Sequence, residues 1–265
     1  MPPTDDPVVL ESEGAVAVIR LNRPAVLNAI DAPTAAAFLA AVRQVASLPD
    51  LRAIVLKGSG RSFCAGGDVA RFAGGREDVA EAVESIIGPL HEAIGLLTDL
   101  AAPSVACLHG AVAGAGLSLA LACDLAIAAS DARFTLAYAR IGATPDASST
   151  WHLPRVVGLR RAKEMALLAE TVDAPEALRL GIVNRVVPAE GLEEETAGVA
   201  ARLAAGPTAA YGRIKRLLHA SAAGAPLRNQ LEAEREAFLA SVATDDFEEG
   251  VAAFLAKRPP RFEGR

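Results

Sequence analysis

Two segments of this chain follow the same order of an apolar run, a glycine-rich turn and the start of a helix. In the first, Arg52–Lys57 (RAIVLK) precedes the turn GSGRSFCAGGD and a helical region over about 79–100. In the second, Ser104–Leu108 (SVACL) precedes HGAVAGAG and an apolar helix over Leu117–Cys123. This order points backbone N–H groups into a site. It predicts a layered α/β fold whose site is built partly from backbone.

The remaining pattern extends this prediction over the whole chain. Strands are expected at Ala15–Leu21 and Leu125–Ala129, and a helix capped by Asp31 is expected to run to about Ser47. After Gly158 the pattern is almost wholly helical, with one strand-like run at Ile182–Val187 (IVNRVV). Helices are expected at 160–169, 192–204, 208–220, 227–242 and 245–257. This α-rich tail is expected to pack on the core or on a neighbouring subunit.

Composition excludes several classes of protein. A chain of 265 residues with 52% hydrophobic and 22% charged residues is long and apolar enough for a packed core, as one large or two small domains. The net charge of −6 argues against a nucleic-acid binding protein. The 3 cysteines fit neither a disulfide framework nor a zinc site. The acidic N-terminus, MPPTDDP, is unlike a signal peptide, so a cytoplasmic location is expected.

Other site signatures are missing or incomplete. The charge-free stretch Ala101–Cys123 contains a proline, a histidine and several glycines, which favours buried structure over a membrane span. Neither a P-loop nor a complete dinucleotide-binding fingerprint is present. The segment Gly116–Ala120 (GLSLA) is one glycine short of a nucleophile elbow, so a serine hydrolase built on Ser118 remains an alternative. The 4 histidines show no metal-binding spacing, and no metal is expected.

Phe63–Asp68 (FCAGGD) and His109–Gly116 (HGAVAGAG) together resemble the enoyl-CoA hydratase/isomerase superfamily, also called the crotonases. Further matching segments follow in order along the chain: LNRP (21–24), LNA (27–29), LALACD (119–124), ALRLG (177–181) and EGVAAFLAKR (249–258). The resemblance implies an α/β spiral of β-β-α turns over residues 1–200, which carries the acyl-CoA site. It also implies a helical trimerisation region over 201–265. The expected partners are an acyl-CoA substrate and further copies of the chain, as a homotrimer or a dimer of trimers, and no bound cofactor besides the CoA of the substrate.

The resemblance also implies roles for individual residues. The backbone N–H groups of Gly67 and Ala115 would hold the thioester oxygen, because removal of a proton beside a thioester creates an enolate that preorganised donors stabilise. Substrate and CoA contacts would come from the two glycine loops, the first turn and the C-terminal tail: Ala25, Val26, Ala65, Gly66, Asp68, Gly114, Ser118, Tyr138, Phe254 and Lys257. In particular, Phe254 and Lys257 would reach the CoA of a neighbouring subunit, with Arg258 and Arg261 adding positive charge for its phosphates.

The chain departs from the hydratase pattern at both acidic positions. Adding water to a double bond calls for two carboxylates, and the corresponding positions hold Ser118 and Tyr138. One acid remains nearby, Asp146, in the segment IGATPDASSTWHLPR. That segment resembles the branch of the superfamily that isomerises epoxyphenylacetyl-CoA and shifts 3-enoyl-CoA double bonds, in which the matching Asp is the acid/base.

These residues favour an acyl-CoA isomerase in which Asp146 transfers the proton. A capping role for Asp146 at the start of a helix is an alternative interpretation of the same residues. A hydratase that uses Asp146, a thioesterase built on Ser118 and a noncatalytic acyl-CoA-binding homologue also remain open.

Overall fold

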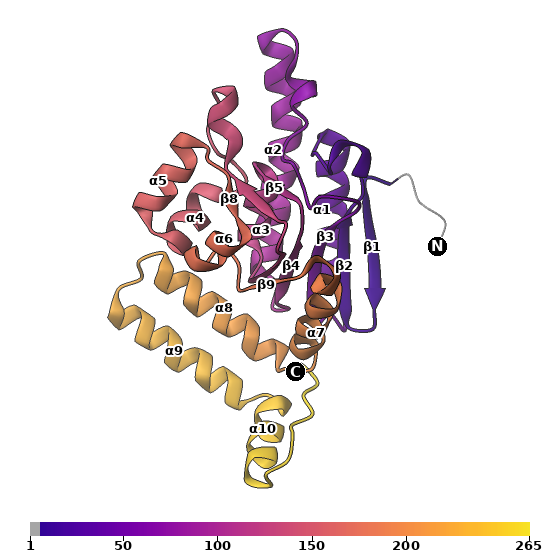
Figure 1. The fold of residues 1–265 in the computed structure, drawn as a ribbon. Coiled ribbons are helices and arrows are strands. Elements are labelled where there is room, and N and C mark those ends of the chain that lie inside the picture. The colour runs from indigo at the N-terminus through magenta and orange to yellow at the C-terminus, as the bar shows by residue number, and fades with distance from the viewer. Residues whose placement is uncertain (1–5) are drawn as a thin grey trace.

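The computed structural model describes residues 6–265, so the first five residues of the MPPTDDP segment lie outside the described part. The core is a six-stranded sheet in the order β1-β2-β3-β4-β6-β9. All neighbouring pairs are parallel except β1 with β2 (Figure 1). The strands are β1 Val8–Glu13, β2 Val16–Leu21, β3 Ala53–Gly58, β4 Ser104–Leu108, β6 Leu125–Ala129 and β9 Arg185–Val187.

A second, shorter layer lies inside the first. It contains β5 (Ala111–Ala113), β7 (Arg133–Thr135) and β8 (Val172–Asp173) in the order β5-β7-β8. Isolated bridges extend this layer, from Cys64 to Val112 and from Ile30 to Gly67. From β2 to α4, each turn of the chain thus adds one strand to the large sheet, one extended segment to the inner layer, and then a helix. The expected spiral of β-β-α turns is confirmed.

The helices of the spiral follow from local signals. Helix α1 (Ala32–Ala46) begins where the Asp31 side chain accepts a hydrogen bond from the Thr34 N–H, as the sequence predicts. Helix α2 (Arg76–Asp99) packs against α1. Helix α3 (Ala115–Ala122) is buried along its whole length. Short 3-10 helices lie in the connecting loops: η1 Pro24–Val26, η2 Val69–Phe72, η3 Ala137–Ile141 and η4 Ala189–Gly191.

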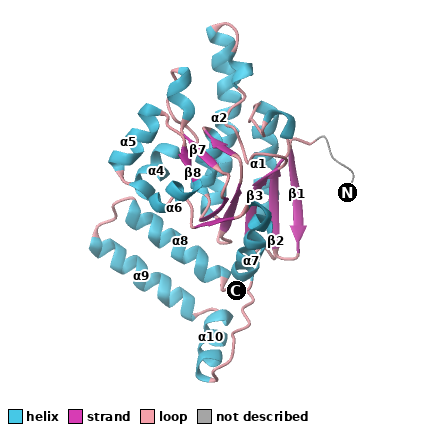
Figure 2. Cartoon of the chain, in the orientation of Figure 1, coloured by secondary structure: helices cyan, strands magenta, loops and turns pink. Residues whose placement is uncertain are grey.

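The second half of the chain is helical, as expected, with β8 and β9 between its helices (Figure 2). Its helices are α4 Ser149–Val157, α5 Leu159–Leu168, α6 Ala174–Leu180, α7 Leu192–Ala204, α8 Thr208–Ala222, α9 Leu227–Val242 and α10 Asp245–Leu255. Helix α7 packs on β3, β4 and β6 and crosses residue 200. The expected boundary between a spiral over residues 1–200 and a helical region over 201–265 therefore falls inside a helix that packs on the core, and this division stays a prediction.

The last three helices extend away from the spiral. Figure 1 shows α8 and α9 running beside each other below the core, with α10 at the far end from α2. A nearly buried ion pair fastens α8 to the spiral, because the Lys215 Nζ lies 2.8 Å from Asp124 Oδ2 and also donates to the Leu100 carbonyl at 2.9 Å. The C-terminal tail returns to the core, where Arg52 donates to the carbonyls of Gly206 and Phe262. Among the described residues, no helix is long and apolar enough to cross a membrane.

Candidate active site

The two glycine loops predicted from the sequence meet at the inner layer. The Cys64 N–H donates to the Ala111 carbonyl at 3.0 Å, and the Ala113 N–H donates to the Cys64 carbonyl at 2.9 Å. This close approach requires glycine on both sides. A Cβ on Gly66, whose φ is +104°, would lie 3.0 Å from the Ala113 carbonyl oxygen, and one on Gly116 would lie 2.4 Å from that of Cys64.

The loops present two backbone donors that the rest of the described chain does not use. The Gly66 N–H donates to the Cys64 Sγ and the Gly114 N–H to the Thr135 carbonyl. Within residues 6–265, by contrast, the N–H groups of Gly67 and Ala115 donate to no other residue. Ala115 is also the first residue of the buried helix α3, where the helix dipole contributes partial positive charge. The pair is suited to stabilising an oxyanion.

A buried amide and an ion-pair bridge hold the first loop in place. The Asn28 side chain donates to the carbonyls of Ser59, Ser62 and Phe63 at 2.8, 2.7 and 3.1 Å. The Arg23 guanidinium lies 3.0 Å from a carboxylate oxygen of Asp31 and 3.3 Å from one of Asp68. The structure thus places the Asp68 carboxylate against Arg23, at the end of the first glycine loop.

Asp146 lies on the loop between η3 and α4, beside Tyr138 and Ser118. The Tyr138 hydroxyl donates a hydrogen bond to Asp146 Oδ1, and the Ser118 hydroxyl donates to the Asp146 carbonyl at 3.2 Å. The alternative in which Asp146 caps a helix fails, because α4 begins after Ser148 without a side-chain cap. The Asp146 carboxylate is therefore available for other chemistry.

Burial sets the protonation of several groups near the site. Burial, followed by the charge of Asp146, raises the pKa of Tyr138 well above its usual range, so the phenol stays protonated. Burial also raises the pKa of the Cys64 and Cys123 thiols to about 12, which leaves neither as a thiolate nucleophile near neutral pH.

The geometry of Ser118 does not favour a serine hydrolase. Its side chain is fully buried, and its hydroxyl donates to the carbonyl oxygens of Gly114 and Asp146. In the described part of the chain no histidine is hydrogen-bonded to this hydroxyl, so no imidazole is in place to activate it as a base.

The predicted CoA contacts fall in two places. Ala25 and Val26 are exposed on η1. The Ala65 N–H donates to the Leu27 carbonyl at 3.0 Å, which brings the segment around η1 and the first glycine loop together. Phe254, 83% exposed, and Lys257 lie instead on and just after α10, at the end of the molecule opposite α2 (Figure 1). The chain does not bring this second pair to its own Asp146.

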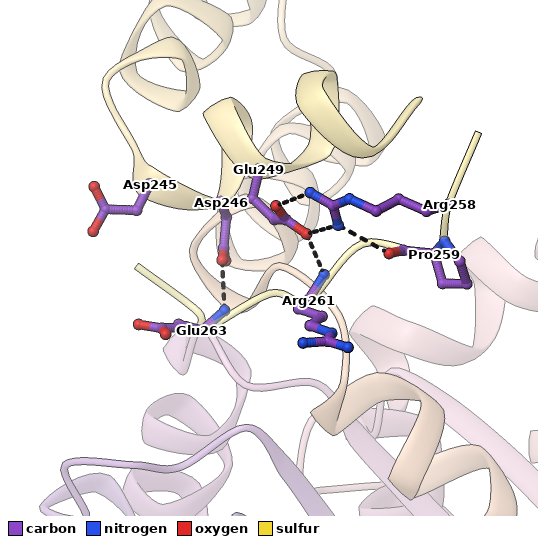
Figure 3. A pocket seen from close by; sticks show the side chains of 7 residues that line it. All are labelled: Asp245, Asp246, Glu249, Arg258, Pro259, Arg261 and Glu263. Atoms are coloured by element: carbon purple, nitrogen blue, oxygen red, sulfur yellow. Dashed lines mark hydrogen bonds and ion pairs between the residues drawn. The ribbon is translucent and has the colours of Figure 1, made fainter. Parts of the chain in front are cut away.

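The tail forms a polar cavity of about 760 Å³. Figure 3 shows the Arg258 guanidinium engaging Glu249, at 2.6 and 2.7 Å, while the Arg261 N–H donates to the same carboxylate. Asp246 accepts from the backbone N–H groups of Glu263 and Gly264. The charge of Arg258 is therefore already paired, which weakens its predicted role in binding phosphates.

Sequence reasoning missed one histidine at the site. His91, on α2, accepts a hydrogen bond from the Ala147 N–H at 3.1 Å and so fixes the residue that follows Asp146. The two residues lie 56 positions apart, and no local pattern distinguishes this histidine from a surface one. The sequence analysis also missed the Asn28 amide and the Arg23 ion pairs that hold the first glycine loop, although both residues belong to segments that carry the family resemblance.

Comparison with known proteins agrees with this arrangement. A family profile described as enoyl-CoA hydratase/isomerase matches residues 11–265. A probable enoyl-CoA hydratase of Rhodobacter capsulatus is 44% identical over 255 residues, which cover 96% of each chain. The 1,2-epoxyphenylacetyl-CoA isomerase of Escherichia coli is 37% identical over 257 residues, covering 96% of this chain and 97% of the relative.

Solved structures show the same fold. The crystal structure of a putative enoyl-CoA hydratase/isomerase from Mycobacterium abscessus superposes with a TM-score of 0.91 at 37% identity, over 97% of this chain and 100% of that one. With the family profile spanning nearly all of the sequence, the conclusion is that this chain belongs to the enoyl-CoA hydratase/isomerase family and is an enzyme of that family.

Proposed function

We propose that this enzyme is an acyl-CoA isomerase that moves a double bond, or rearranges an epoxide, with Asp146 as its one acid/base. The observation that carries the proposal is the set of side chains around Asp146. Its carboxylate accepts from the Tyr138 hydroxyl and its carbonyl from Ser118, so both positions expected to hold the acids of a hydratase hold hydroxyl groups instead. A single carboxylate suffices for a proton shift but leaves no second acid for water addition.

The proposed reaction proceeds in two proton transfers. The Asp146 carboxylate removes a proton from C2 of a 3-enoyl-CoA, and the electron pair of that C–H bond moves toward the thioester oxygen. The N–H groups of Gly67 and Ala115 hold the resulting enolate oxygen. Protonated Asp146 then returns the proton to C4, which leaves a 2-enoyl-CoA and regenerates the carboxylate. The reaction uses no bound cofactor besides the CoA of the substrate.

Mass spectrometry with two substrates tests this assignment. Incubation with a 3-enoyl-CoA is expected to give a product of unchanged mass, and incubation with a 2-enoyl-CoA is expected to add no water. Asp146→Asn should abolish turnover, whereas Asp131→Asn, an exposed residue in the turn after β6, should not. Turnover that survives in Asp146→Asn would refute the mechanism.

Hydration is the second candidate function, because the Rhodobacter relative is named a probable enoyl-CoA hydratase. The same experiment separates the two, since hydration adds the mass of water to a 2-enoyl-CoA. Release of free CoA that Ser118→Ala blocks would instead support a thioesterase. Tight acyl-CoA binding without turnover of any substrate would support a noncatalytic homologue.

We also propose that the chain assembles as a trimer or a dimer of trimers in a reducing, cytoplasmic compartment. Helix α9 buries none of its residues within one chain, although it carries several large apolar side chains. Exposed apolar residues continue from α8 to α10: Leu218, Leu227, Leu231, Phe238, Leu239 and Phe254. Large exposed apolar side chains gathered on neighbouring helices are typical of an interface. The described cysteines are all free and buried, which supports the choice of compartment.

Light scattering after size-exclusion chromatography tests the assembly. The expected mass is three or six times that of one chain. Leu231→Glu combined with Leu239→Glu should reduce it, while Glu236→Gln, on the same helix, should leave it unchanged. A monomeric wild-type protein would contradict the proposal.

A further inference from the structure

We propose that Tyr138 is a positioning residue for Asp146, whose hydroxyl holds carboxylate oxygen Oδ1 and leaves Oδ2 to carry the proton. The inference rests on the proposed role of Asp146. It differs from the sequence-based expectation, in which Tyr138 contacts the substrate.

The backbone around Asp146 is already fixed by other groups. The Asp146 carbonyl accepts from the hydroxyls of Ser118 and Ser149, at 3.2 and 2.9 Å, and the Ala147 N–H donates to His91 at 3.1 Å. Ala147 is fully buried with a φ of +48°, a conformation that an L-residue adopts only when its surroundings hold it there. What remains free in this arrangement is the rotation of the Asp146 side chain itself.

Tyr138 controls that rotation. Of the described residues, it alone donates a hydrogen bond to the Asp146 carboxylate, and it does so through Oδ1. Tyr138 lies on η3 and packs against the hydrophobic core, so its ring is a fixed support for the hydroxyl. A carboxylate held at one oxygen keeps the other oriented for proton transfer, whereas a freely rotating one would sample unproductive orientations.

A phenol hydroxyl is suited to this role because it can donate to a carboxylate oxygen. A second carboxylate at position 138 would instead place two like charges side by side. Burial keeps the pKa of Tyr138 above its usual range, so its hydroxyl stays protonated and able to donate near neutral pH.

Tyr138→Phe removes only the oxygen and so tests the inference. We expect the rate of C2 proton exchange into deuterated water to fall about tenfold, with the Kd for acyl-CoA unchanged. The loss should appear in kcat rather than in KM, because the contacts that bind the substrate are unchanged. Tyr211→Phe, on α8, is the matched control and should change neither.

The outcomes separate the inference from the proposed function. Exchange lost in Asp146→Asn but unchanged in rate in Tyr138→Phe would overturn the inference alone. A weakened Kd in Tyr138→Phe with an unchanged rate at saturating acyl-CoA would overturn it in favour of substrate contact. Exchange that persists in Asp146→Asn would overturn both.

Discussion

Gly116→Ala tests whether the contact between α3 and the first glycine loop sets the spacing of the two backbone donors. The new Cβ would lie 2.4 Å from the Cys64 carbonyl oxygen and 2.7 Å from the Cys64 Cβ. Contacts of a Cβ below 3.0 Å essentially never occur, so the start of α3 must move from the loop by the difference between 2.4 and 3.0 Å, about 0.6 Å. Gly116 has no positive φ, so the effect is one of space alone.

That displacement is large for an oxyanion site. Donors act within a range of about 0.4 Å, and misplacement of a reacting group by about 1 Å costs about a hundredfold in rate. We expect kcat/KM for isomerisation to fall about 10- to 100-fold, with about 1–3 kcal/mol lost from the free energy of unfolding through overpacking.

The control lies on another helix. Gly95, on α2, has no atom within 4 Å of an added Cβ, so Gly95→Ala should keep the wild-type rate and gain up to about 1 kcal/mol of stability. Rates are to be measured well below the unfolding temperature, with near-UV circular dichroism as the check of the fold. A folded Gly116→Ala protein with the wild-type kcat/KM would refute the reasoning, because the donors would then not depend on this contact.

Three further changes test the surrounding framework. Lys215→Met leaves the Asp124 carboxylate without its cation and should lower the free energy of unfolding in urea by about 2–4 kcal/mol. The double variant Lys215→Met with Asp124→Asn should lose less of this free energy than the two single variants lose together. If the losses are additive, the two residues are not coupled. Asn28→Ala leaves three carbonyls without their donor and should cost at least about 2 kcal/mol and lower turnover, so a variant of unchanged stability would contradict the anchoring role. Burial lowers the pKa of His152 to about 4, below its usual value of about 6.5. Between these two pH values the unfolded chain binds a proton at His152 that the folded chain does not. The free energy of unfolding should therefore fall as the pH drops from about 6.5 to about 4. His152→Gln should flatten that change, and an equally steep dependence would show that another group is responsible.

Elements with a strong local signal were predictable from the sequence. The expected ranges of α7 and α9 coincide with the observed ones, because prolines and glycines limit α7 at both ends and α9 at its start, such as Pro207 after α7 and Pro226 before α9. Apart from Ser104, the first residue of β4, strands β4 and β6 are apolar because they lie in the middle of a parallel sheet covered on both faces.

The missed elements depend on partners distant in sequence. Strands β5, β7 and β8 have only two or three residues each, too few for a periodic signal, and exist because the spiral brings them into register. Strand β1 is an edge strand, and α4 contains Pro154, which argues locally against a helix. The roles of Gly67 and Ala115 came from family resemblance, and the structure adds that their N–H groups have no partner in the described chain.

One physical requirement connects the membrane-like stretch Ala101–Cys123 with the proposed chemistry. A helix dipole and backbone donors act most strongly where water is excluded, and α3 meets this condition because all of its residues are buried. A charged side chain anywhere along such a helix would be buried without a partner, so the segment is restricted to apolar, small and hydroxyl-bearing residues. The first charge after it, Asp124, lies at the end of the helix, where Lys215 and Ser104 pair with it. The absence of charge that suggests a membrane span is, in this fold, what would let the Ala115 N–H serve as a strong donor in the proposed mechanism.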